Sequence, residues 1–155
     1  MISPRTILGP HASRGFTLIE AMVALVVLAV GMLGIAGLYV TTLRAGGSAI
    51  NRMQAVGLAG DLADRIRANR TANVAYNAAA ADNNCYGAGA VVCAPALLAA
   101  NDVFVWQKQV VAMLPGGNGA VVAAPVAGGP FTYLITVTWV EQGGTAVNYA
   151  MTFQI

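Results

Sequence analysis

The chain has 155 residues and a mass of 15.8 kDa, which suits one compact domain with a single additional long element, not two full domains. Hydrophobic residues make up 57% of the chain and charged residues only 9%, which excludes a disordered protein and indicates that part of the chain contacts lipid. The net charge of +2 arises from Arg5 and Arg14 near the N-terminus, so no nucleic acid partner is expected.

The residue types needed for catalysis are scarce. The single histidine is His11, and the serines are Ser3, Ser13 and Ser48. The acids are too scattered to propose a catalytic pair. We therefore expect no enzyme, no cofactor, no metal site and no small-molecule substrate.

Residues 21–40 form an uncharged apolar run whose helix would span roughly 30 Å, the thickness of a bilayer core. Residues 1–15 before it contain two arginines and no acid. This basic leader is expected to stay in the cytoplasm, which places the chain after the apolar run in the periplasm.

Two simpler interpretations of this segment are a plain signal anchor and a secretory signal peptide cleaved near residues 34–36. The length of the apolar run argues against the second. Glu20 argues against both, because a carboxylate at the edge of the run is costly in lipid unless it is paired or protonated. Glu20 is therefore a functional candidate, with an unpaired carboxylate at the headgroup level as the alternative.

Residues 14–20 read Arg-Gly-Phe-Thr-Leu-Ile-Glu, and this string resembles the class III leader of type IV prepilins and pseudopilins. The resemblance implies that a prepilin peptidase cuts between Gly15 and Phe16 and that Phe16 becomes N-methylated. It also implies that the apolar helix is kept, first as membrane anchor and then as filament core. Glu20 would neutralise the terminal ammonium of Phe16 on a neighbouring subunit.

The helix is expected to continue to about Asn69. An apolar stripe lies along this second half, with charged pairs at helical spacing opposite it. The stripe comprises Ala55, Ala59, Leu62 and Ile66, and the pairs are Asp61 with Arg65 and Asp64 with Arg67. Gly31, Gly34 and Gly37 recur three residues apart, which favours either close helix packing or local softening of the helix.

Residues 71–100 are rich in Ala and Asn and are expected to form an irregular surface connection. Because the periplasm is oxidising, Cys85 and Cys93 within it are expected to form a disulfide. Asn101 and Asp102 indicate the N-cap of a helix that runs to Leu114, although its β-branched residues leave a strand as the alternative. Residues 115–117 then end this element.

Residues 119–124 favour a short strand. Residues 131–139 and 147–155 alternate apolar and polar side chains around a glycine turn at 141–145, which predicts an antiparallel hairpin with its apolar face toward Leu62. Aromatic residues at this spacing indicate core packing rather than a carbohydrate site. The predicted fold class is α+β, with a long N-terminal helix packed on a small antiparallel β-sheet, as the resemblance to type IV pilins also implies.

Residues 61–70 and 106–117 further resemble minor pilins of the PilV type, also called type IV pilus modification proteins. This resemblance implies a leader (1–15), a transmembrane and filament-core helix (16–40) and a periplasmic head (41–155). The implied partners are prepilin peptidase, other minor and major pilins, and the inner membrane. The implied function is to prime or cap a pilus used in adhesion and motility.

Two alternatives stay open. A type II secretion pseudopilin shares the leader and the long helix. A membrane-tethered binding module would instead capture its ligand through the loop around Cys85 and Cys93.

Overall fold

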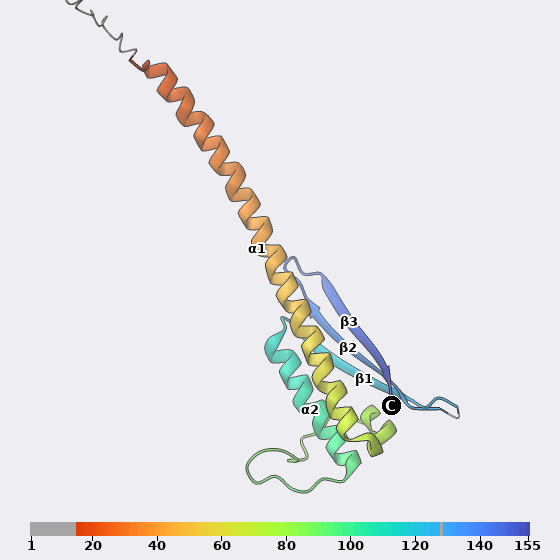
Figure 1. Ribbon diagram of the computed structural model, residues 1–155. Coiled ribbons are helices and arrows are strands. Elements are labelled where there is room, and N and C mark those ends of the chain that lie inside the picture. Colours follow the sequence, from red (N-terminus) through yellow and green to blue (C-terminus); the bar gives the residue numbers. More distant parts are fainter. Residues whose placement is uncertain (1–14, 128) are drawn as a thin grey trace, which may run out of the picture. The chain divides into compact units, whose positions relative to one another are not determined.

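The computed structural model describes residues 15–127 and 129–155. The predicted leader therefore lies outside the described residues, except for Gly15. In chain order the elements are α1 (Leu18–Ala68), η1 (Arg70–Asn77), α2 (Pro95–Met113), β1 (Asn118–Ala124), β2 (Thr132–Val140) and β3 (Ala146–Gln154) (Figure 1). The chain divides after Thr42 into two units, and α1 contributes residues to both.

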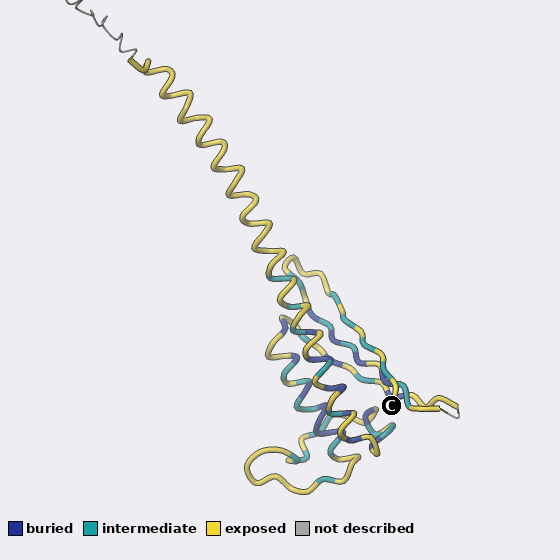
Figure 2. Tube along the Cα trace, viewed as in Figure 1, coloured by how far each residue is buried: buried dark blue, intermediate teal, exposed yellow. Residues whose placement is uncertain are grey.

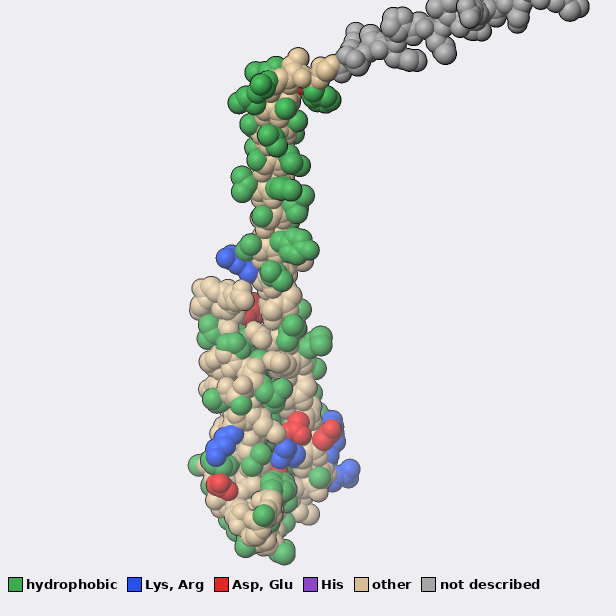
Figure 3. Space-filling view, turned by 90° about the vertical axis from the view of Figure 1, so that its left-hand side faces the viewer, with side chains coloured by type: hydrophobic (Ala, Val, Ile, Leu, Met, Phe, Trp, Pro, Cys, Tyr) green, Lys and Arg blue, Asp and Glu red, His purple; other side chains and the backbone are tan. Residues whose placement is uncertain are grey.

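The first unit is the N-terminal part of α1. All of its described residues are exposed (Figure 2), and on the face that Figure 3 shows its side chains are almost all hydrophobic. The 18-residue window of highest mean hydropathy in α1 reaches 2.6, so the helix is long and apolar enough to cross a membrane. The predicted apolar helix is confirmed.

The second unit contains a three-stranded antiparallel sheet in the order β1-β2-β3. In this sheet Ile135 of β2 pairs with Val121 on one side and Met151 on the other. The turn between β2 and β3 places Gly143 and Gly144 at φ 108° and 82°, a region in which side-chain-bearing residues are strained. The predicted hairpin is confirmed, and its strands differ from the predicted bounds by one residue at each end.

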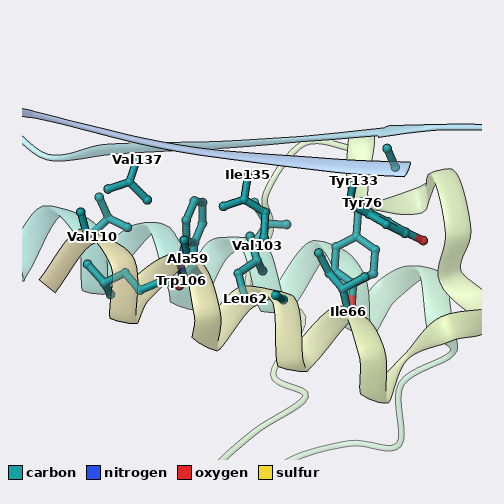
Figure 4. Close-up of a cluster of buried hydrophobic side chains, with 14 of the residues drawn as sticks. Ala59, Leu62, Ile66, Tyr76, Val103, Trp106, Val110, Tyr133, Ile135 and Val137 are labelled. Carbon is teal, nitrogen blue, oxygen red and sulfur yellow. Dashed lines mark hydrogen bonds between the residues drawn. The ribbon is translucent and has the colours of Figure 1, made fainter. Parts of the chain in front are cut away.

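The core lies between the sheet and two helices, α1 and α2. Figure 4 shows side chains of β2 pointing toward those of the helices. Every second residue of β2 is buried, and these buried residues pack with the apolar stripe of α1 in one core. The fully buried members are Ala55, Ala59, Leu62, Ala63 and Ile66 of α1, Ala99, Trp106 and Val110 of α2, and Ile135 and Val137 of β2. Burying each large apolar side chain contributes about 1.5–3 kcal/mol, so this cluster holds the helices to the sheet.

Helix α2 begins at Pro95, six residues before the predicted start. The prediction that Asn101 and Asp102 cap a helix is wrong, because both lie inside α2 and both are buried. Proline is favoured at the first position of a helix, and the alanines and leucines that follow it are good helix formers. The side chain of Asn69, just after α1, donates to the carbonyl of Pro95 over 2.9 Å and holds this end of α2.

The connection between α1 and α2 is also more ordered than predicted. Residues 70–77 form η1, a short 3-10 helix interrupted at Asn73, whose φ is 46°. Tyr76 of η1 is buried against the core, with its ring edge-on to Tyr133 of β2. The irregular part of the predicted loop is therefore limited to residues 78–94.

Candidate functional site

Two places in the chain carry the predicted functional residues. The first is the start of α1, where Gly15 and Phe16 lie in a non-helical segment directly before the helix. Phe16 is 80% exposed. A peptide bond between two exposed, non-helical residues is accessible to a peptidase, which needs an extended substrate.

Thr17 caps this end of the helix. The backbone N–H of Glu20 points to the Thr17 side-chain oxygen, 3.4 Å away, and to the Thr17 carbonyl at 3.1 Å. The Thr-x-x-Glu spacing is a known capping signal, and the positive end of the helix dipole stabilises an acid in the first turn. Glu20 is the only charged residue from 15 to 43, so its carboxylate has no cationic side chain along this stretch of helix.

The second place is the loop between η1 and α2. Cys85 and Cys93 form a disulfide, as predicted, with their Cα atoms 5.7 Å apart. Asn101 holds the base of this loop, because its side-chain oxygen accepts the backbone N–H of Asn83 at 2.8 Å. Asn101 thus secures the loop that precedes α2 from within the helix.

Asp102 lies beside this loop and is 1% exposed. Its carboxylate accepts the hydroxyl of Tyr86 at 2.5 Å and that of Tyr76 at 3.1 Å, and Arg65 Nη1 lies 3.6 Å away. A buried carboxylate is costly unless its oxygens are bonded, and these three partners supply the donors. We name Asp102, Tyr76, Tyr86 and Arg65 the Asp102 cluster.

The Asp102 cluster joins α1, η1, the disulfide loop and α2. Burial, reinforced by the hydrogen bond to Asp102, raises the pKa of Tyr86 to about 12. Burial and the charge of Asp102 also raise the pKa of Tyr76. Both hydroxyls therefore stay protonated at neutral pH and act as donors, so the cluster is a structural clamp for the loop.

The sequence pattern did not reveal this cluster. Arg65 was expected to pair only with Asp61, and that bond is present at 2.9 Å, as is the bond of Arg67 to Asp64 at 2.6 Å. The additional contact of Arg65 to Asp102 joins residues far apart in the sequence. No local spacing signals such a contact.

Comparison with known protein families gives two matches. Residues 10–36 match the family model described as the prokaryotic N-terminal methylation motif, and residues 37–104 match that of the type IV pilin Tt1218. The chain is therefore similar to type IV pilins over residues 37–104 and carries their N-terminal methylation motif before that region. The long N-terminal helix and the small antiparallel sheet are the α+β fold of a type IV pilin. The family is structural and non-enzymatic, in agreement with the sequence analysis.

The two matched regions of the chain meet between Ala36 and Gly37. The methylation motif contains Gly15, Phe16 and Glu20, while the Tt1218 match contains the second half of α1, the disulfide loop and the start of α2. No curated protein and no solved structure matches the chain.

Proposed function

We propose that this pilin is a minor pilin of the PilV type that primes or caps a type IV pilus. Prepilin peptidase would cut after Gly15, and Phe16 would then be N-methylated. The observation that carries the proposal is the exposed apolar part of α1 with a single acid, Glu20, in its first turn. An apolar surface of this extent requires cover from lipid or from other helices.

The proposed organisation follows from that surface. Residues 16–40 would anchor the chain in the inner membrane as a single pass with the leader in the cytoplasm, and residues 41–155 would form the periplasmic head. After assembly the same helix would pack among helices of other minor and major pilins. The head would then lie on the pilus surface, where adhesion and motility are determined.

Glu20 would direct this assembly by pairing with the terminal ammonium of Phe16 on a neighbouring subunit. Two opposite charges attract more strongly in an apolar environment than in water, and an unpaired Glu20 would be costly there. Gly31, Gly34 and Gly37 support close packing, because a Cβ on any of them would meet no atom of another described segment within 4 Å. Space at these positions is therefore open to another helix.

The test is the pair of variants Glu20→Ala and Asp64→Ala in the native host. Asp64 is a second exposed acid, in the last turns of α1. Both variants should yield a chain that begins at N-methylated Phe16, measured by intact mass with and without prepilin peptidase. Glu20→Ala should reduce recovery of the chain in purified pili at least tenfold, whereas Asp64→Ala should not.

Three outcomes would contradict the proposal. Normal recovery of Glu20→Ala in pili would remove the role of Glu20. A chain that retains Met1 in both strains would indicate a signal anchor. Recovery with a type II secretion apparatus, and not with pili, would identify a pseudopilin.

A further inference from the structure

The two edges of the sheet differ in how their backbone groups are satisfied. At the β1 edge, the side chain of Asn77 donates to the carbonyl of Ala123 at 2.7 Å and accepts its N–H at 2.6 Å. The side chain of Gln107 donates to the carbonyl of Gly119 at 2.9 Å. Side chains of η1 and α2 therefore cover the outer edge of β1 at Gly119 and Ala123, as folded proteins commonly do for an edge strand.

The β3 edge has no such cover. Phe131 and Ile155 exchange both backbone hydrogen bonds, at 2.9 and 3.1 Å. Because bonded and non-bonded pairs alternate along an antiparallel ladder, the residues of β3 that direct their N–H and C=O groups outward are Ala146, at the hairpin end, and Asn148, Ala150, Thr152 and Gln154. Among residues 15–127 and 129–155, no other segment forms a backbone hydrogen bond with these groups.

β3 also lacks the features that usually prevent an exposed edge from pairing. Its nine residues include no charge and no proline, and its register with β2 runs without a bulge from Ala146 to Gln154. Natural edge strands are typically shortened, bulged or charged. A long, regular and uncharged edge is the surface that strand addition uses.

A pocket lies beside this edge. It has a volume of about 380 Å³, and its lining residues are Arg52 and Val56 of α1, Trp139 of β2, and Val147, Asn148 and Tyr149 of β3. Trp139 is 2% exposed, yet its indole N–H has no hydrogen-bond partner within the described part of the chain. Buried indole N–H groups are normally paired. Because this nitrogen has almost no accessible surface, an oxygen acceptor that enters the pocket would pair with it after a small shift of the pocket walls.

The apolar side of β3 is likewise only half covered. Val147, Tyr149, Met151 and Phe153 pack against the core but stay partly exposed. On the helix beside them, Val56 is 48% exposed. A further strand along β3 would place alternate side chains over these residues and over the pocket.

We propose that an extended strand of a different pilus subunit completes the sheet at β3, with an Asp, Glu, Asn or Gln side chain entering the pocket at Trp139. Arg52 lines the pocket with a side chain that is 63% exposed, and its Nε lies 3.3 Å from Glu141 Oε1. Its other guanidinium N–H groups can donate to a further acidic residue. The β3 strand of a second copy has no acidic residue, and its Val147, Tyr149, Met151 and Phe153 already pack on its own core, so two copies paired edge to edge would bring no acid to the pocket. This inference rests on the proposed assembly into a pilus.

The first test is hydrogen exchange of the full wild-type chain, alone in detergent and within the purified minor pilin complex. The N–H groups of Asn148, Ala150, Thr152 and Gln154 should exchange at least 100-fold more slowly in the complex. The alternate N–H groups, which bond to β2, should be protected in both samples. Equal exchange of these four N–H groups in the two samples would overturn the proposal. Protection of the same groups when the isolated chain is simply concentrated would also overturn it.

The second test compares Ala150→Pro with Ala150→Ser. Proline removes an outward N–H and no bond to β2, whereas serine keeps that N–H. Both variants should be processed at Gly15, and Ala150→Pro should be recovered in pili at least tenfold less than Ala150→Ser. Equal recovery of the two variants would overturn strand addition without overturning the proposed function. The proposed function is tested separately, by processing at Gly15 and by the Glu20→Ala comparison. If Ala150→Pro fails to fold, the exchange test on the wild-type chain decides.

Discussion

The indole nitrogen of Trp106 donates a hydrogen bond to the backbone carbonyl of Leu58 over 2.8 Å. Trp106 lies in the middle of α2 and is completely buried, and Leu58 lies on α1. The opposite end of the ring faces β1, where a Cβ on Gly119 would come within 2.5 Å of it. One side chain thus connects both helices and the sheet.

Replacing Trp106 with Phe should lower the free energy of unfolding by about 1–3 kcal/mol, because the variant loses the bond to Leu58 and leaves a small cavity. Urea unfolding of the chain in detergent, followed by near-UV circular dichroism, measures this loss. Val111→Ala on the same helix is the control, since Val111 is 65% exposed and should change stability by less than about 0.5 kcal/mol. Equal effects of the two variants would contradict the bridging role of Trp106.

Replacing Gly119 with Ala should destabilise the head by about 1–3 kcal/mol, because the new Cβ would overlap the Trp106 ring. Gly60→Ala is the matched control. A Cβ on Gly60 meets nothing within 4 Å, and alanine in a helix interior should raise stability by about 0.5–1 kcal/mol. The two melting temperatures should therefore move in opposite directions, and a common direction would refute the packing argument.

Replacing both Cys85 and Cys93 with serine should lower the free energy of unfolding by about 2–3 kcal/mol in the chain-entropy model, since the disulfide closes a short loop. Denaturation with and without a reductant provides the comparison. The wild-type chain should lose the same stability when reduced, while the double variant should not respond. A wild-type midpoint that is insensitive to complete reduction, verified by alkylation and mass, would show that the Asp102 cluster holds the loop unaided.

Tyr86→Phe tests the pH dependence of the Asp102 cluster. The pKa of Tyr86 is raised to about 12 in the folded state, above the ordinary value of about 10. Its contribution to stability is therefore complete below about pH 10 and is lost as the pH rises toward 12. The stability difference between the wild type and Tyr86→Phe, measured by urea unfolding at both pH values, should shrink across this window. A constant difference would exclude the titration of Tyr86 as its cause.

Periodicity was sufficient to predict the elements with a clear apolar face. The stripe through Leu62 and the alternation through Ile135 each repeat the period of their element, because one face of each is buried. The start of α2 was not predictable in this way. From Pro95 to Ala100 the sequence has no polar residue, so no alternation of apolar and polar positions marks a helix there. The polar Asn101 and Asp102 that follow resembled a helix N-cap.

The Asp102 cluster and the uncovered β3 edge could not be predicted from the sequence for a different reason. A side chain such as Asp102 has the same local signature whether it caps a helix or accepts bonds from Tyr76 and Tyr86 inside the core. Only the three-dimensional arrangement distinguishes these two roles. Similarly, the sequence of β3 predicts a strand but not which of its two edges remains free.

The fully buried residues of the helices include several of the smallest side chains, at Ala55, Ala59, Ala63 and Ala99. In a chain with many alanines these four have no distinguishing mark in the sequence. In a saturation mutagenesis experiment they should nevertheless tolerate little beyond glycine or serine, whereas the alanines of residues 78–94 should accept most substitutions. The strongest evolutionary constraint on this head would then fall on its least conspicuous residues.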